Sequence, residues 1–182
     1  GNGTTKDDER AFHWFHVSAQ KGLMASQHAL GVCYAFGQGI PQDDTLSLLW
    51  FEKAAKQGDA DSQYRVALSY LWGRGVAKNQ NLAFEWFAKS AQQGDVNAEF
   101  SLGKCYFYGM GVPQDYHLSI KWLKKAYNKE HISAKILLMV AYEKVEKTEE
   151  AQLILNTMTQ HEYDNMDPDI FIEYGKFVLR NT

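Results

Sequence analysis

The stretch that decides the fold is LGKCYFYGMGVPQDYHLSIKWLKKA, residues 102–126. A closely similar stretch, LGVCYAFGQGIPQDDTLSLLWFEKA, occupies residues 30–54, and a third copy lies between the two at residues 66–90. Successive copies are offset by 36 residues. A fixed period of this length is typical of a repeat protein, in which each unit buries its hydrophobic face against its neighbours.

The register of the repeat is set by glycines and aromatic residues that recur along the chain. They are Tyr34, Tyr70 and Tyr106; Gly37, Gly73 and Gly109; Gly39, Gly75 and Gly111; and Trp14, Trp50, Trp86 and Trp122. Three full units therefore span residues 22–57, 58–93 and 94–129, and a half unit or N-terminal cap precedes them at residues 1–21. A degenerate unit at residues 130–164 and a C-terminal capping helix at residues 165–182 follow. We expect residues 1–182 to form one domain.

Each unit is predicted to contain two helices. In the middle unit, apolar and small residues at helical spacing predict a first helix around residues 60–72 and a second around residues 81–92. Asp59 and Asn79 stand where N-caps belong, and Gly58 suits a helix C-terminus with positive φ. Small residues at one position, Gly31, Ala67 and Gly103, indicate that another helix passes close by. The sequence thus predicts an all-α solenoid of antiparallel helix pairs.

The composition is that of a folded, water-exposed protein. Hydrophobic residues make up 45% of the chain and charged residues 23%. The formal net charge of −3 does not favour nucleic acid or an anionic membrane as a partner. No apolar run approaches the roughly 20 residues that cross a bilayer. The partner is therefore expected to be neither nucleic acid nor membrane.

The repeat resembles the Sel-1-like repeat family, which is related to tetratricopeptide repeats. The residues that carry the resemblance are Leu102, Gly103, Tyr106, Gly109, Gly111, Val112, Asp115, Trp122, Lys125 and Ala126, and the match covers about residues 7–160. The resemblance implies a right-handed α-solenoid, a bacterial origin and a role as an adaptor or scaffold in signalling, secretion or host interaction. It brings no catalytic residues with it.

The two ends depart from the repeat pattern. Trp14 and Phe15 match a second helix but no first helix precedes them, so the half unit is either a natural cap or the cut end of a longer solenoid. In the fourth unit the Gly-x-Gly turn is missing, and the second helix resumes early, near Thr148, as in a plain tetratricopeptide hairpin. The polar start of the chain predicts no signal peptide, which leaves the cytoplasm and the periplasm of a bacterium open.

Residues that could support chemistry are few. Cys33 and Cys105 occupy the same position two repeats apart, so we expect two free thiols rather than a disulfide. The six histidines show no metal-binding spacing, and the Gly-x-Gly turns lack the lysine and third glycine of phosphate-binding loops. We therefore predict no metal, no cofactor and no enzymatic activity.

An aromatic row with basic neighbours is the candidate binding site. His28, Tyr64 and Phe100 share one position of the first helices, and Ala35, Leu71 and Phe107 share another. Aromatic residues and arginine dominate protein-binding hot spots. The predicted partner-binding residues on the concave face are His28, Tyr64, Arg65, Phe100, Lys104 and Phe107. A second interpretation, that these rings pack between adjacent repeats, remains open.

Three functions follow from these observations. The first is a monomeric, non-catalytic scaffold that captures a protein partner, such as a signalling or secretion component, in the groove between first helices. The second is an immunity-type or inhibitor protein that neutralises one toxin or enzyme. The third is a hydrolase, as proposed for some relatives, although no nucleophile–base pair in the sequence supports it.

Overall fold

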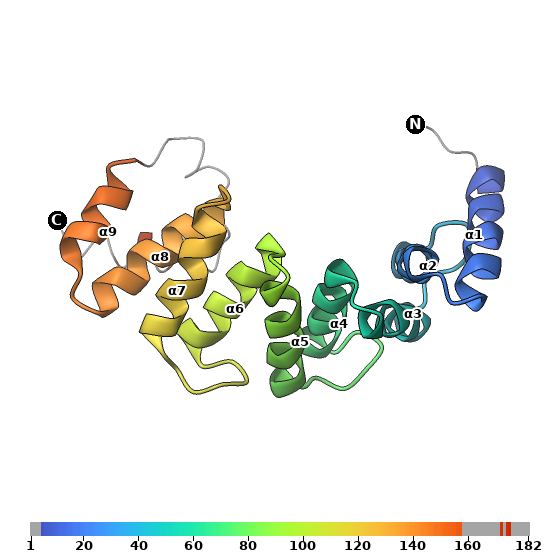
Figure 1. Cartoon of the computed structure of the whole chain (residues 1–182), viewed down its shortest axis with the longest axis horizontal. Helices are drawn as coiled ribbons and strands as arrows, with labels where there is room; N and C mark the ends of the chain where they lie inside the picture. The colour runs from blue at the N-terminus through green and yellow to red at the C-terminus, as the bar shows by residue number, and fades with distance from the viewer. Residues whose placement is uncertain (1–4, 158–171, 173, 176–182) are drawn as a thin grey trace. The chain divides into compact units, whose positions relative to one another are not determined.

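The computed structural model describes residues 5–157 together with Ile172, Tyr174 and Gly175 (Figure 1). Nine helices can be delimited in these residues, and they contain no strand: α1 (Thr5–Gln20), α2 (Met24–Phe36), α3 (Asp44–Lys56), α4 (Ala60–Trp72), α5 (Gln80–Gln92), α6 (Val96–Tyr108), α7 (Tyr116–Tyr127), α8 (Ile132–Lys144) and α9 (Thr148–Leu155). The predicted all-α architecture is confirmed. The capping helix predicted at residues 165–182 falls almost entirely outside the described residues.

The helices form two compact units, residues 1–93 and residues 94–182. In the first unit α1 to α5 pack consecutively, each against the next. In the second, α6 to α9 do the same, and α6 also contacts α8. The single domain expected over residues 1–182 stays a prediction. None of the helices within the described part of the chain is both long enough and apolar enough to span a bilayer.

The helix boundaries follow from local capping. The side chains of Asp43, Asp59, Asn79, Asp95 and Asp115 each accept a hydrogen bond from the backbone N–H three residues later. The first helices α2, α4 and α6 end at Gly37, Gly73 and Gly109, which adopt the left-handed conformation with φ near 70°. Asparagine and aspartate stabilise helix starts, and glycine tolerates positive φ, so the sequence specifies both ends of these helices.

In the first two Gly-x-Gly turns, the second glycine is required by a close backbone approach. At Gly75 a Cβ atom would collide with the carbonyl oxygen of Asp44, at the start of α3. At Gly39 it would collide with the carbonyl oxygen of Asp8 in α1. The turn of one repeat therefore lies directly on the preceding second helix, where only glycine fits.

The small residues of the first helices mark the helix crossings inside each repeat. A Cβ on Gly31 would lie 2.7 Å from Cδ1 of Phe51, and one on Gly103 would lie 2.7 Å from Cγ of Leu123. At the same two crossings Ser47 Oγ donates to the Gly31 carbonyl and Ser119 Oγ to the Gly103 carbonyl, both at 2.9 Å. The predicted close approach is confirmed at both glycines.

The fourth repeat has a shorter turn, as predicted. After α8 ends at Lys144, only three residues precede α9, which begins at Thr148. Glu146 in this turn adopts a positive φ of 59° without being glycine. Residues 134–142 of α8 are all buried, so this helix forms the centre of the hydrophobic core of the second unit.

Candidate interaction surface

The solvent-facing side of each first helix follows from the position of its core. In α4 the buried residues are Ser62, Gln63, Val66 and Ala67. On a helix, residues three or four positions apart lie on the same face. The face of α4 opposite its buried residues carries Asp61, Arg65, Leu68 and Trp72. The equivalent row in α2 is Ala25, Ala29, Val32 and Phe36, and in α6 it is Asn97, Ser101, Lys104 and Tyr108. We call these rows the outer stripes.

Each outer stripe ends in an exposed aromatic residue. Phe36, Trp72 and Tyr108 are 63%, 56% and 38% exposed, and each stands directly before the glycine that ends its helix. We call these three residues the aromatic ladder. The aromatic ladder was not predicted from the sequence, although the 36-residue spacing of its three rings is a signal for it.

Two of the predicted binding residues lie on the outer stripes. They are Arg65 in the first unit and Lys104 in the second, both partly exposed. The Nε atom of Arg65 lies 3.3 Å from Oδ1 of Asp61, one turn earlier on the same stripe. Arg65 and Lys104 thus lie on the same stripes as the aromatic ladder.

His28 packs between two repeats. Its Nδ1 atom lies 2.9 Å from the Ser62 hydroxyl and 3.2 Å from Oδ2 of Asp59, and its Nε2 atom lies 3.4 Å from Oδ2 of Asp61. All three partners belong to the start of the following first helix, α4, or to its N-cap. His28 thus links α2 to α4, and its ring also packs near that of Phe51.

The remaining predicted rings also face neighbouring helices. Phe100 stacks on His131 of the next repeat, with ring centroids 4.5 Å apart. Tyr64, which is half-buried, lies 5.7 Å from the ring of Phe87. Phe107 is only 3% exposed and packs against Tyr116 in the core, so its predicted place on the groove surface is wrong. The cause is helix phase: successive residues are turned by about 100°, which rotates this row away from the outer stripe towards the next repeat.

The contacts of His28 also bring together a serine, a histidine and an aspartate. In hydrolases such a group activates the serine for attack on a substrate. Here Ser62 has no exposed surface, so no substrate can reach its hydroxyl. The arrangement therefore holds repeats together, and it offers no accessible nucleophile.

The second helices carry a different repeated contact. The ammonium groups of Lys53, Lys89 and Lys125 lie 3.8, 4.1 and 4.0 Å from the ring centroids of Trp50, Trp86 and Trp122. Such cation–π contacts shield the tryptophan faces from water. The sequence named only Lys125, as part of the family resemblance, and the cation–π contact was not predicted although each lysine follows its tryptophan by three residues.

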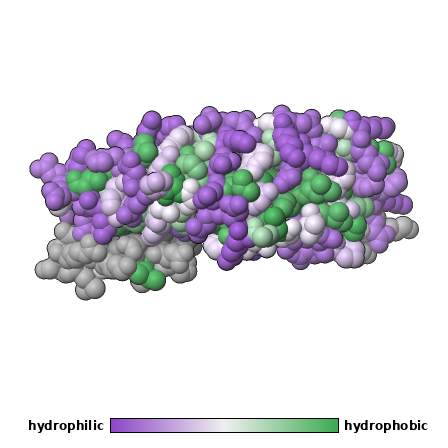
Figure 2. Space-filling view, turned by 90° about the horizontal axis from the view of Figure 1, so that it is seen from below, coloured by the Kyte–Doolittle hydropathy of each residue, from purple (hydrophilic) through white to green (hydrophobic). Residues whose placement is uncertain are grey.

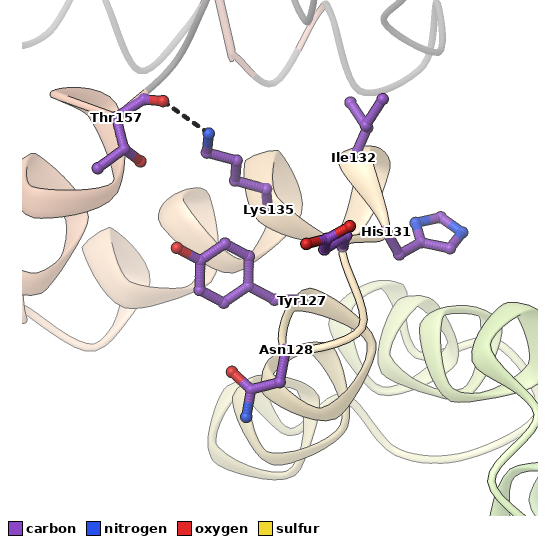
Figure 3. A pocket seen from close by; sticks show the side chains of 7 residues that line it. Tyr127, Asn128, His131, Ile132, Lys135 and Thr157 are labelled. Atoms are coloured by element: carbon purple, nitrogen blue, oxygen red, sulfur yellow. Dashed lines mark hydrogen bonds between the residues drawn. The ribbon is translucent and has the colours of Figure 1, made fainter.

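A pocket of about 670 Å³ lies in the second unit, between the end of α7, the start of α8 and the segment that follows α9 (Figure 3). Its lining residues are Tyr127, Asn128, Glu130, His131, Ile132, Lys135 and Thr157. The Lys135 ammonium donates a hydrogen bond of 2.8 Å to the Thr157 carbonyl. In Figure 3 the His131 ring points away from these two groups. Burial lowers the pKa of His131.

No group of three histidine, cysteine or acidic residues suited to a metal ion occurs in the described ranges.

Both cysteines are free and buried. Burial raises the pKa of Cys105 to about 12, against a smaller opposing effect of Lys104. Burial, and then the charge of Asp8, raise the pKa of Cys33. Nucleophilic cysteines need the opposite, a lowered pKa and an exposed sulfur.

Comparisons with known proteins identify the repeat. The chain is similar to c5321, a protective antigen of uropathogenic Escherichia coli with an SLR fold, at 25% identity and a TM-score of 0.77, over 94% of this chain and 34% of that one. It is similar to a Sel1 repeat protein from Oxalobacter formigenes at 33% identity and a TM-score of 0.65, over 70% and 37% of the two chains. The chain thus spans about a third of the length of both proteins.

A more distant structure shares the fold alone. Helicobacter pylori cysteine rich protein B is 19% identical, with a TM-score of 0.57, over 74% of this chain and 97% of that one. No curated protein matches the sequence. The Sel1 repeat model matches residues 1–23, 25–59, 60–95 and 96–131, more than half of the chain. With these four consecutive matches and the capped helix pairs that underlie them, the chain belongs to the Sel1 repeat family.

Proposed function

We propose that this chain is a non-catalytic scaffold that binds a protein partner through the outer stripes of its first helices. Sel1 repeat proteins are generally protein-interaction scaffolds, and the family is generally non-catalytic. The observation that carries the proposal for this chain is the aromatic ladder of Phe36, Trp72 and Tyr108, exposed at one repeat position.

The aromatic ladder is not needed for the stacking of repeats. Its residues lie on the side of each first helix opposite the core. The equivalent position of the fourth repeat is Lys144, and α8 forms without an aromatic residue there. Exposed aromatic side chains rimmed by polar residues are typical of binding sites, since they bury a large area at low cost in side-chain entropy.

The surface of the first unit and the basic residues on the outer stripes support the same proposal. On the face drawn in Figure 2, hydrophobic side chains gather over the first unit, on the right of the view, with hydrophilic ones around them. Arg65 and Lys104 supply basic groups beside the aromatic ladder, and arginine is favoured at hot spots. His28, Tyr64 and Phe100 flank the surface as half-buried residues. We do not include Phe107, because its ring is buried.

The test separates binding from stability. Affinity capture from the native organism, with the wild-type chain as bait, identifies the partner. Phe36→Ala, Trp72→Ala and Tyr108→Ala are each expected to weaken that complex by about thirtyfold, which corresponds to about 2 kcal/mol. The melting temperatures of Phe36→Ala and Trp72→Ala should stay near that of the wild type, since these rings are more than half exposed. The Tyr108 ring also meets the edge of the buried Phe107 ring, so Tyr108→Ala should lower the melting temperature more than the other two.

Two controls make the result decisive. Trp50 is only 8% exposed, so Trp50→Ala should lower the stability by roughly 3–5 kcal/mol. Lys53→Ala changes the second-helix surface and should leave binding intact. The proposal would be contradicted if the partner bound all three ladder variants as tightly as the wild type but did not bind Lys53→Ala. That result would indicate an interaction with the second helices.

A further inference from the structure

A small depression opens between the first two repeats of the first unit. Its volume is about 80 Å³, and it lies between α2, the start of α3, α4 and the turn after α4. The lining residues are Ala35, Phe36, Asp44, Ser47, Phe51, Arg65, Leu68, Ser69 and Arg74. Ala35, Phe51 and Leu68 are among its apolar lining residues. The side chains of Arg65, Arg74 and Asp44 add two guanidinium groups and one carboxylate. The depression therefore combines an apolar lining with charged groups.

The two arginines of the depression are not part of the repeat pattern. The residues equivalent to Arg65 are Ala29 and Ser101, and those equivalent to Arg74 are Gln38 and Met110. The neighbouring repeats form the same helices and the same turn without them. Helix pairing and stacking thus do not require either arginine.

One of the two positive charges is already balanced. Arg65 pairs with Asp61 at 3.3 Å. Asp44 accepts a hydrogen bond from Gln42 and lies in the first turn of α3, where the helix dipole stabilises a carboxylate. By contrast, no ion pair or side-chain hydrogen bond joins the exposed guanidinium of Arg74 to another residue in the part of the chain that the structure describes. A carboxylate on a ligand would complement it.

We propose that the first unit binds an extended segment of the partner in which an aliphatic residue of the size of valine or leucine stands next to an aspartate or glutamate. The aliphatic side chain enters the depression and packs on the apolar side chains of Ala35, Phe51 and Leu68 that line it. The acidic side chain pairs with Arg74, and the rings of Phe36 and Trp72 flank the segment. This inference rests on the proposed function and names the chemistry of its ligand.

The chain itself supplies matched variants for a test. Arg74→Gln introduces the residue that the first repeat has at this position, Gln38. Ala35→Leu introduces the residue that the second repeat has at the equivalent position, Leu71, and should fill the depression. Both substitutions place a side chain that another repeat of this fold accommodates, and melting temperatures will verify that both variants are folded.

The experiment is selection from a random-peptide phage library on the immobilised whole chain, followed by anisotropy titration of the selected peptides. Enriched sequences should pair an aliphatic residue with an adjacent acidic one. Arg74→Gln should weaken their binding about fivefold, as expected for an exposed ion pair, and should reduce its dependence on salt. Ala35→Leu should weaken binding more than tenfold, and replacing the peptide's aliphatic residue by alanine should do the same to the wild type.

Other outcomes separate this inference from the proposed function. Peptides that lose affinity with Phe36→Ala or Trp72→Ala but not with Arg74→Gln or Ala35→Leu would overturn the inference and support the aromatic ladder. Peptides insensitive to all four substitutions would contradict both. Failure to enrich any sequence with the aliphatic–acidic pair would also overturn the inference.

Discussion

The ammonium group of Lys129 lies 2.9 Å from both carboxylate oxygens of Glu99, whose side chain is 4% exposed. The same two repeat positions hold Gln27 with Gln57 and Gln63 with Gln93, joined by amide hydrogen bonds of 2.7 and 2.8 Å. Each pair ties the end of a second helix to the first helix of the same repeat. The third repeat has therefore exchanged a neutral pair for an ionic one.

This exchange predicts a non-additive pair of substitutions. Lys129→Ala should lower the free energy of unfolding by roughly 1–3 kcal/mol, because it leaves a buried carboxylate without its cation. The double variant Glu99→Gln/Lys129→Gln should lie within about 1 kcal/mol of the wild type, since it reproduces the pair of the earlier repeats. Urea unfolding of the variants measures both values. A double variant as unstable as Lys129→Ala would show that the two positions are not equivalent between repeats.

The close crossing at Gly103 predicts a large cost for a bulky residue. Gly103→Leu should destabilise the chain by about 1–3 kcal/mol or more, because even its Cβ would lie 2.7 Å from Cγ of Leu123. Gln38→Leu, at an exposed position of a turn, should change the stability by no more than about 0.5 kcal/mol. Thermal unfolding followed by circular dichroism gives the comparison. Equal shifts in melting temperature for the two variants would contradict the crossing.

The buried thiols predict slow alkylation of the folded chain. With its pKa raised to about 12, Cys105 has a thiolate fraction on the order of 10⁻⁵ at pH 7, and its sulfur is also buried. Iodoacetamide should therefore modify neither cysteine in the native state within minutes, and both in urea without a reductant. Intact mass should show two labels per unfolded chain. A mass without labels in urea would reveal a disulfide.

The cap of α8 predicts a pH dependence of stability. The Nδ1 atom of His131 accepts the backbone N–H of Ala134 at 3.2 Å, which requires the neutral ring, and burial lowers its pKa from the ordinary 6.5. The unfolded chain consequently takes up this proton first. The contribution of neutral His131 to the free energy of unfolding is complete above about pH 6.5. It declines as the pH falls below this value.

A capping residue that does not titrate provides the matched comparison. His131→Asn keeps a side-chain acceptor at the N-cap, so the variant should lose less stability than the wild type between about pH 7.5 and pH 5.5. Urea midpoints at both pH values test this. The same loss in both proteins would assign the pH dependence to other groups.

Sequence reasoning predicted the helices well because their determinants are local. The N-caps Asp59 and Asp95 and the left-handed glycines act on their own neighbours in the chain, and the 36-residue repetition shows each signal three times. The early start of α9 at Thr148 was predicted from the missing Gly-x-Gly turn, which is also a local feature of the sequence. Small residues opposite large ones, such as Gly31 opposite Phe51, needed only the helical period.

The binding surface was predicted only in part, because it depends on which way a helix is turned. Arg65 and Lys104, predicted as partner-binding residues, lie on the outer stripes, and their role in binding stays a prediction, whereas Phe107 is buried. Tyr108, its neighbour in sequence, is the exposed ring. Both positions are aromatic, so the hydrophobic pattern alone could not distinguish the core ring from the surface ring.

The sequence by itself determined the repeat, the ends of its helices and the places where only glycine fits, because a cap, a positive φ and a 36-residue period are properties of the chain. The tertiary structure alone decided which aromatic rings meet solvent. A rotation of about 100° between adjacent helix positions directs His28 and Phe100 to the next repeat and leaves Phe36, Trp72 and Tyr108 outside. The direction in which each ring points depends on the packing of neighbouring helices, which no single segment of the sequence specifies.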